Sequence, residues 1–424
     1  MNSSLQQRIA DLDARLREAA KPINVLKYLN WPDAVEHQFL ADWQAGNPRL
    51  PDVSFKVPDW SQEIEELDQL VVDCEGEHPV LRFLAQTAWS YAEAGRMLMA
   101  AGSPEFSQSS IRLYGRPDDV YQTQSFTGVD AARFLLEKTA HLLAGSYVPI
   151  NEEIFAAVPF ANRLRRAVQS YFADDAVEVL VDDKLSSKAI AGTSRIRVRA
   201  SAMFSDLDFD QLYHHEALVH MATAINGKRQ SNLQCLGLSA PRTTRTQEGL
   251  AVFAELVTHS IDIQRLRRLA LRILAIKMAL EGANFLEVFQ FFLSEGQDPR
   301  ESYKSTQRVF RGGKVEGSVA FTKDCTYLKG LMETHVFLNI AIRDNRPELI
   351  SRLFAGRLTL GDVVTLGPAF DSGFLTSPRY IPVWASDTRR LAAALAYSSF
   401  MMNVDLKNIT LDRFVQAENR AVVS

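Results

Sequence analysis

The spacing of apolar residues along the chain is mostly helical. Residues 1–147 show this spacing, interrupted by the proline- and glycine-containing stretches NWPD, GNPRLPD and YGRPDD. Helical spacing also covers residues 246–293 and the later stretch YLKGLMETHVFLNIAIRD, residues 327–344. The pattern predicts a helical N-terminal region and long helices in the C-terminal half.

One region, residues 176–202, has the pattern of β-strands. VEVLVDD and SRIRVRA alternate or cluster β-branched residues, and KAIAG lies between them. Residues 208–224 then return to helical spacing, and the Asn-Gly pair that follows predicts the end of that helix. The expected fold class is therefore α+β and mainly helical. We expect a helical N-terminal region over residues 1–147 and a second domain over residues 148–424. In the second domain, a small sheet directly precedes the helix expected over residues 208–224.

Composition and charge narrow the class of protein. The chain has 424 residues, 46% hydrophobic and 23% charged, with a net charge of −4, which gives no global reason to expect nucleic-acid binding. The basic run RLRR at residues 265–268 is interpreted as a solvated helix face. Three scattered cysteines predict free thiols. The N-terminus lacks the apolar core of a signal peptide, and no apolar run approaches the roughly 20 residues of a membrane span, so we expect a cytoplasmic protein.

Three histidines and a glutamate stand close together in the stretch YHHEALVH. The zinc-protease motif H-E-x-x-H has histidines four residues apart, whereas His215 and His220 are five apart and Leu218 stands four after His214. On a straight α-helix, residues five apart diverge by about 140° and could not share an ion. A π-bulge absorbs one extra residue and brings such residues onto one face. We therefore predict a bulge between His215 and His220, with Glu216 as the base beside a metal.

A catalytic zinc needs about three protein ligands and one open position. The stretch TRTQEGLAVFAELVTHS offers a third ligand, because Glu248 opens an amphipathic helix 28 residues after His220. Glu255 and His259 lie on nearly the same face as Glu248 and are rival ligands or outer partners. The alternative is that these histidines are ordinary polar or core residues, and that Glu248 only stabilises the helix dipole.

HEALVH followed by TQEGLA resembles the family named for modulating flavohemoglobin expression through a QEGLA motif, which includes the microtubule-associated tyrosine carboxypeptidases. INVLKYLNWP near the start, and FRGG followed by FTKDCTYLKG near the end, extend the resemblance over most of the chain. It implies a zincin-like domain with an H-E-x-x-x-H helix and one Zn²⁺ per chain. His215, His220 and Glu248 would be the metal ligands and Glu216 the general base. The implied activity is that of a zinc metallopeptidase, a carboxypeptidase that removes a C-terminal aromatic or tyrosine-like residue from a peptide or protein.

The residues that would bind the substrate can be predicted from the groups that a carboxypeptidase must recognise. The strand before the motif helix, SRIRVRA or its neighbour, is expected to pair with an extended substrate at the edge of the cleft. A carboxypeptidase must also neutralise a terminal carboxylate, and Arg242, Arg245, Arg311 and Lys323 are candidates. We favour Arg311 and Lys323 for substrate binding, with Tyr327 as a catalytic hydrogen-bond donor to the developing oxyanion.

Two other functions remain open at this point. The chain could be a regulatory or binding protein that keeps the zincin fold without turnover. It could also be an aminopeptidase or an endopeptidase built on the same zinc plan.

Overall fold

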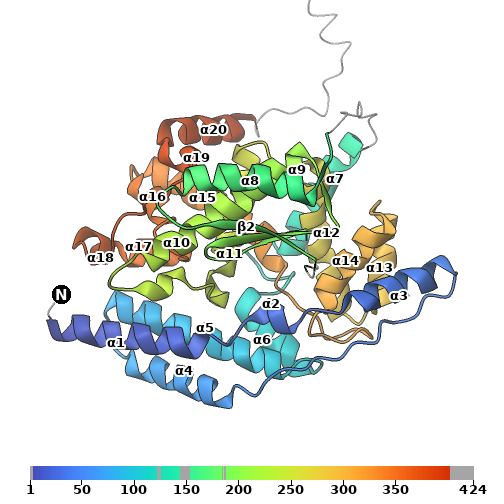
Figure 1. Ribbon diagram of the computed structural model, residues 1–424, viewed down its shortest axis with the longest axis horizontal. Coiled ribbons are helices and arrows are strands. Elements are labelled where there is room, and N and C mark those ends of the chain that lie inside the picture. Colours follow the sequence, from blue (N-terminus) through green and yellow to red (C-terminus); the bar gives the residue numbers. More distant parts are fainter. Residues whose placement is uncertain (1–2, 122–125, 144–152, 184, 186–187, 402–424) are drawn as a thin grey trace, which may run out of the picture.

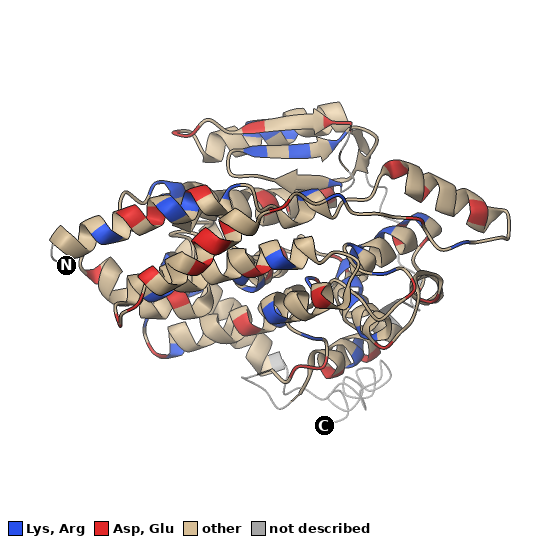
Figure 2. Cartoon of the chain, turned by 90° about the horizontal axis from the view of Figure 1, so that it is seen from below, with Lys and Arg blue, Asp and Glu red and all other residues tan. Residues whose placement is uncertain are grey.

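The computed structural model describes residues 3–121, 126–143, 153–183, 185 and 188–401, and in these the protein is mainly helical with two small sheets (Figure 1). This confirms the expected α+β class. Basic and acidic residues are interspersed along the helices (Figure 2). Within the described part, no helix is both long and apolar enough to cross a membrane.

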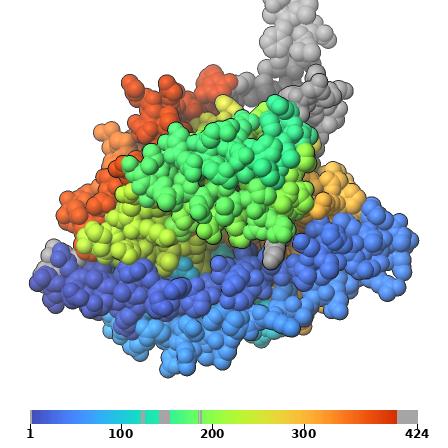
Figure 3. Space-filling view, viewed as in Figure 1, coloured from blue at the N-terminus to red at the C-terminus, as the bar shows by residue number. Residues whose placement is uncertain are grey.

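The N-terminal part consists of helices, as predicted, with one isolated β-bridge between Val120 and Thr127. Helices α1, α4 and α5 pack against one another, and they form the lower edge of the molecule in Figure 3. The bounds are α1 (Ser3–Ala20), α2 (Val25–Tyr28), α3 (Asp33–Gln44), α4 (Ser61–Asp73), α5 (Pro79–Met99), α6 (Pro104–Tyr114) and α7 (Gly128–Leu143).

The sheet region confirms both predicted strands and adds a third. VEVLVDD contains β2 (Glu178–Asp182), KAIAG contains β3 (Ala189–Ala191) and SRIRVRA contains β4 (Arg195–Arg199). β4 lies in the centre, parallel to β2 and antiparallel to β3. SRIRVRA itself is therefore internal, and its neighbours β2 and β3 are both edge strands, of which β3 contacts Glu216. A second sheet pairs β1 (Phe155–Ala156) with β5 (Met203–Phe204).

The alternation in β4 explains how the sheet is covered. Ile196 and Val198 are fully buried in one hydrophobic cluster with α8 (Ala157–Tyr171). Arg195 and Arg197 lie on the opposite face, where they form ion pairs with Glu178 and Asp182 of the parallel strand β2.

The helix with the histidines follows the sheet and ends later than predicted. It comprises α9 (Asp206–Leu212), a π-helix (Tyr213–Met221) and α10 (Ala222–Lys228), so the Asn-Gly pair lies inside it. A Cβ atom on Gly227 would lie 2.3 Å from the backbone oxygen of Leu236. Asn226 donates a hydrogen bond from its side chain to the backbone oxygen of Phe354. The pair therefore serves close packing and not helix termination.

The remaining helices form the C-terminal half of the described chain. Their bounds are α11 (Thr244–Val257), α12 (Ile263–Leu280), α13 (Phe285–Ser294), α14 (Pro299–Phe310), α15 (Cys325–Arg343), α16 (Glu348–Arg352), α17 (Leu360–Thr365), α18 (Gly367–Asp371), α19 (Val383–Ser386) and α20 (Thr388–Met401).

The largest hydrophobic cluster joins the two ends of the chain. It contains Leu16 of α1 and Leu84 of α5 together with Leu250 of α11 and Leu338 of α15. The histidine helix and α11 are thus held against the N-terminal helices by a continuous core. The domain boundary predicted between residues 147 and 148 lies outside the described residues and stays a prediction.

Helices α11 and α15 cross at two glycines. A Cβ atom on Gly249, the glycine of the QEGLA stretch, would lie 2.1 Å from the backbone carbonyl carbon of Gly330. A Cβ atom on Gly330 would lie 2.1 Å from the backbone oxygen of Arg245. The two backbones approach so closely that neither position has room for a side chain, and this crossing fixes where α11 presents Glu248.

Replacing Gly249 with alanine is expected to destabilise the protein. The added methyl group must push α11 away from α15, which should lower the free energy of unfolding by about 1–3 kcal/mol or more. Urea denaturation would measure the change. Gly361→Ala is the matched control, because the nearest atom to its added Cβ, Thr359 Oγ1, lies 3.8 Å away. Equal stability of the two variants would contradict the close crossing.

Candidate metal centre

The histidine motif lies in a widened helix. Residues 213–221 form a π-helix, in which backbone hydrogen bonds join residues five apart. The Nε2 atoms of His215 and His220 consequently lie 3.2 Å apart, on the same side of the helix. This confirms the predicted bulge between the two histidines, and the widening extends over more residues than the single turn expected.

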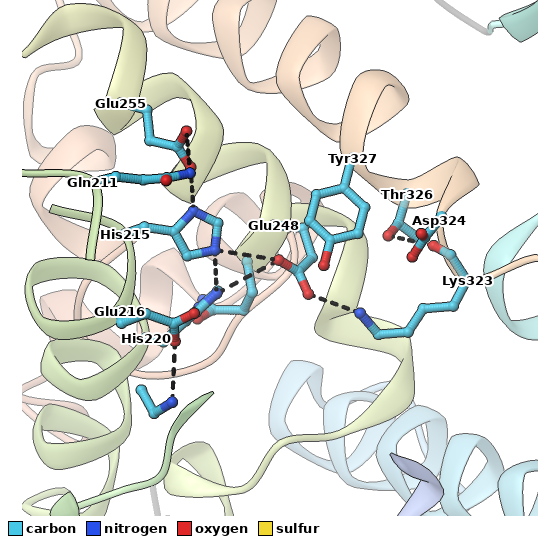
Figure 4. A network of polar contacts seen from close by, with 12 residues as sticks. Gln211, His215, Glu216, His220, Glu248, Glu255, Lys323, Asp324, Thr326 and Tyr327 are labelled. Atoms are coloured by element: carbon cyan, nitrogen blue, oxygen red, sulfur yellow. Dashed lines mark hydrogen bonds and ion pairs between the residues drawn. The ribbon is translucent and has the colours of Figure 1, made fainter. Parts of the chain in front are cut away.

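Glu248 completes a group of three. Its Oε2 atom lies 3.6 Å from His215 Nε2 and 3.5 Å from His220 Nε2, and all three side chains are largely buried (Figure 4). The structure differs from the prediction in one detail. Glu248 stands in the second turn of α11, because the helix begins at Thr244 after a short 3-10 turn at Pro241–Thr243. The helix-dipole explanation for Glu248 therefore weakens.

The geometry of this group fits a tetrahedral metal ion. Two ligand atoms that each lie about 2.0–2.1 Å from a tetrahedral ion are separated by about 3.3 Å. The three separations in the group, 3.2, 3.5 and 3.6 Å, agree with that distance. His215, His220 and Glu248 thus form a possible metal site with two nitrogen donors and one oxygen donor.

An outer set of charges holds His215 in place. Glu255 Oε1 lies 2.5 Å from His215 Nδ1, which leaves Nε2 directed at His220 and Glu248. Arg265 donates two hydrogen bonds to the same carboxylate. Burial raises the pKa of the Glu255 carboxyl, but Arg265 and His215 lower it further, and the pKa falls to about 2. Glu255 is therefore an ionised partner of a ligand.

Two neighbouring expectations change with this arrangement. His259 does not belong to the group of possible ligands, and it is exposed beyond the end of α11 in a left-handed conformation with φ of 56°. The interpretation of residues 265–268 as a solvated helix face is wrong for Arg265, which pairs with Glu255, and for Arg267, which is 8% exposed.

Lys323 holds the other side of Glu248. Its Nζ atom donates a hydrogen bond to Glu248 Oε1 over 2.8 Å, while Oε2 faces the histidines (Figure 4). Burial raises the pKa of the Glu248 carboxyl, but the charge of Lys323 and the contacts with both histidines lower it well below its ordinary value. Lys323 was predicted to bind a substrate carboxylate, and in this structure its charge is already engaged by Glu248.

Glu216 stands beside the group, next to the edge strand. Its Oε2 atom accepts a hydrogen bond from the backbone N–H of Ala191 in β3 over 3.2 Å. The side chain is partly exposed, unlike that of His215. A carboxylate in this position can accept a proton from a water molecule at the metal site.

Tyr327 of α15 lies beside Lys323, and Arg311 follows the last residue of α14. The Tyr327 hydroxyl accepts a hydrogen bond from Arg308 over 3.4 Å, and the Lys323 Nζ atom lies 5.1 Å from the centre of the Tyr327 ring. Arg311 is partly buried, contacts Gln307 at 3.4 Å, and has no partner for its Nε atom. Tyr327 and Arg311 as functional residues stay predictions.

The other two candidate cations are bound to carboxylates of the protein. Arg242 makes two hydrogen bonds to Asp362, each 2.8 Å long. Arg245 lies 3.5 Å from Glu333. Both guanidinium groups therefore have a carboxylate partner outside the metal centre.

Several residues near the site escaped the sequence analysis. Arg308 forms two hydrogen bonds to Asp324, and Arg272 approaches the same carboxylate at 3.5 Å. Arg308 and Asp324 belong to the stretches RVFRGG and FTKDCTYLKG, but nothing local in the sequence pairs them. Arg357 is a further buried cation that stands in no motif.

Metal affinity should distinguish Glu248 from Glu255. Glu248→Ala removes one of the three donors and should abolish stable binding, whereas Glu255→Ala removes only the partner of His215 and should weaken binding about 10–100-fold. Competition with a chelating dye would measure both affinities. Glu255→Gln, which keeps a hydrogen-bond acceptor, is the matched control. Equal losses in the two alanine variants would contradict the assignment of Glu248 as the ligand.

A comparison with protein families identifies the family of the chain. A family model described as microtubule-associated tyrosine carboxypeptidase matches residues 37–403, which include the histidine helix, α11 and α15. A comparison with curated proteins gave no match. Because the family model matches most of the chain, the protein belongs to the microtubule-associated tyrosine carboxypeptidase family.

Proposed function

We propose that the protein is a zinc carboxypeptidase that removes a C-terminal aromatic or tyrosine-like residue from a peptide or protein. The observation that carries this proposal is the convergence of His215, His220 and Glu248 at tetrahedral separations, with Glu216 beside them. Two nitrogen donors and one oxygen donor are typical of catalytic zinc sites. The name of the family supports the reaction class and the aromatic residue.

The roles of the side chains follow from their positions. Zinc, when bound, supplies Lewis-acid polarisation of the scissile carbonyl group and makes an attacking water more acidic. Glu216 would take the proton from that water and deliver it to the leaving amine. Lys323 and Glu255 orient Glu248 and His215, and the hydroxyl group of Tyr327 is proposed to donate a hydrogen bond to the developing oxyanion.

The edge strand β3 is proposed to bind the substrate backbone. β3 pairs with β4 on one side, and on its other side the Ala191 N–H group points at Glu216. An extended peptide lying along this side would place its backbone next to the proposed base. Substrate binding would then compete with Glu216 for the Ala191 N–H group.

We also propose that the protein works in the cytoplasm. The support is chemical: all three cysteines are free and buried, which suits a reducing compartment.

Mass spectrometry of a digested peptide library tests the proposed function. The zinc-loaded protein should shorten peptides by one C-terminal residue, with preference for tyrosine and phenylalanine, and Glu216→Gln should leave them intact. Shortening from the N-terminus, or cuts inside blocked peptides, would instead indicate an aminopeptidase or an endopeptidase. Intact peptides after digestion by zinc-loaded protein would favour a binding or regulatory protein.

A further inference from the structure

Arg357 is a buried arginine without an acidic partner. It lies between α16 and α17, and only 9% of its surface is exposed. Its Nη2 atom donates a hydrogen bond to the backbone oxygen of His220 over 3.2 Å, and its Nε atom has no partner. Among the residues that the structure describes, no carboxylate forms an ion pair with Arg357. Burying a charged guanidinium group without an anionic partner costs free energy, and a bound anion would offset this cost.

The backbone around Arg357 is fixed in place. The Arg357 N–H group donates a hydrogen bond to the backbone oxygen of Leu236 over 2.7 Å. A Cβ atom on the preceding Gly356 would lie 2.8 Å from the Leu236 Cβ. The guanidinium group is therefore held against the histidine helix by a close contact between two chain segments.

Arg357 shares this state with Arg311, whose Nε atom also has no partner, and differs from three other cations near the metal centre. Lys323 is paired with Glu248, Arg265 with Glu255 and Arg308 with Asp324. Burial lowers the pKa of the Arg357 guanidinium group, and Tyr91, Glu216 and Glu248 oppose this shift, although neither carboxylate is within ion-pairing distance. Burial and the like charge of Arg308 lower the pKa of the Arg311 guanidinium group, and Asp324 and Tyr327 oppose this shift. Arg311 is thus surrounded by groups of the α14 and α15 segments, whereas Arg357 is hydrogen-bonded to His220. Arg357 is thus a cation without an ion-pair partner, and its hydrogen bond to the His220 backbone places it beside one of the proposed ligands.

The spacing of residues along a peptide indicates which part of a substrate Arg357 could bind. In a carboxypeptidase, the terminal carboxylate lies one residue beyond the scissile carbonyl group, and consecutive Cα atoms are about 3.8 Å apart. A cation that recognises this carboxylate must lie near the metal ligands without pairing with their side chains. A planar guanidinium group also matches a carboxylate through two parallel hydrogen bonds.

We propose that Arg357 binds the free α-carboxylate of the substrate and so makes the enzyme specific for chain ends. This inference rests on the proposed carboxypeptidase function, and it assigns carboxylate binding to Arg357 where the sequence favoured Arg311 and Lys323. A competing explanation is that Arg357 only balances the charge of Glu216. That explanation predicts that replacing Arg357 leaves the preference for a free terminal carboxylate unchanged.

The test compares an N-acetylated tetrapeptide ending in tyrosine, as the free acid and as the C-terminal amide. Calorimetric titration of zinc-loaded Glu216→Gln protein would give both affinities without turnover. The free acid should bind more tightly, and adding Arg357→Gln should weaken its binding by about 100-fold or more while the amide is little affected. Arg357→Lys should keep part of the preference. Each preference is the ratio of the affinities for the acid and the amide, measured on the same variant. A partial loss of folded protein affects both measurements equally and leaves this ratio unchanged.

Controls separate the two proposals. Arg343→Gln is a matched control, since this arginine side chain is 71% exposed on α15 and pairs with the neighbouring Asp344. Equal affinities for acid and amide with Arg357 intact would overturn both the carboxypeptidase function and the role of Arg357. A preference that survives Arg357→Gln, or that is lost in Arg311→Gln instead, would overturn the role of Arg357 alone.

Discussion

Replacing Glu216 with glutamine is expected to lower kcat/KM for peptide hydrolysis by about 1000-fold while zinc remains bound. Glutamine has nearly the same shape and can still accept the hydrogen bond from Ala191, but it cannot take a proton from water. Steady-state kinetics together with elemental analysis would show both effects. The loss should appear in kcat, because Glu216 acts in the transition state.

The matched control for this variant is Glu281→Gln. Glu281 is an exposed glutamate that pairs with Lys277 on α12, so its replacement should leave the kinetics unchanged. A Glu216→Gln protein that kept most of its activity would mean that another group serves as the base.

Removing either histidine of the pair is expected to empty the metal site. His215→Ala or His220→Ala leaves only two of the three donors, and two donors do not hold zinc in a tetrahedral catalytic site. Hydrolysis should be lost together with the metal. Elemental analysis after dialysis would give about one zinc per chain in the wild-type protein and little in either variant.

His214→Ala is the matched control for the pair. His214 neighbours His215 in sequence, but its ring lies against Tyr213 and does not belong to the three-residue group. This variant should keep its zinc. If His214→Ala lost the metal and His215→Ala kept it, the site would have been assigned to the wrong histidine.

Local geometry explains why the sequence predicted the centre of the site. Five-residue spacing between His215 and His220 is incompatible with a shared ion on a straight helix, so a widened helix follows from the motif alone. The strands at VEVLVDD and SRIRVRA were also predictable, because β-branched residues cluster there. In both cases the signal lies within a few consecutive residues.

The parts that the sequence did not predict depend on contacts between distant segments. The central position of β4 results from its pairing with both β2 and β3, which strand patterns do not encode. Lys323 meets Glu248 across 75 residues, and Arg357 meets the His220 carbonyl across 137. The largely buried position of Arg265 likewise depends on Glu255 of the preceding helix, whereas the nearest charged residue in its own sequence, Arg267, is basic.

Anomalous diffraction at the zinc absorption edge, from crystals of the zinc-loaded protein, tests the central claim most directly. The claim is that a π-helix brings His215 and His220 together with Glu248 around one zinc ion. The predicted result is a single strong peak bounded by the Nε2 atoms of both histidines and a carboxylate oxygen of Glu248, with residues 213–221 still in a π-helix. A map without a peak at these three side chains, or a peak whose histidine ligand is His214, would contradict it.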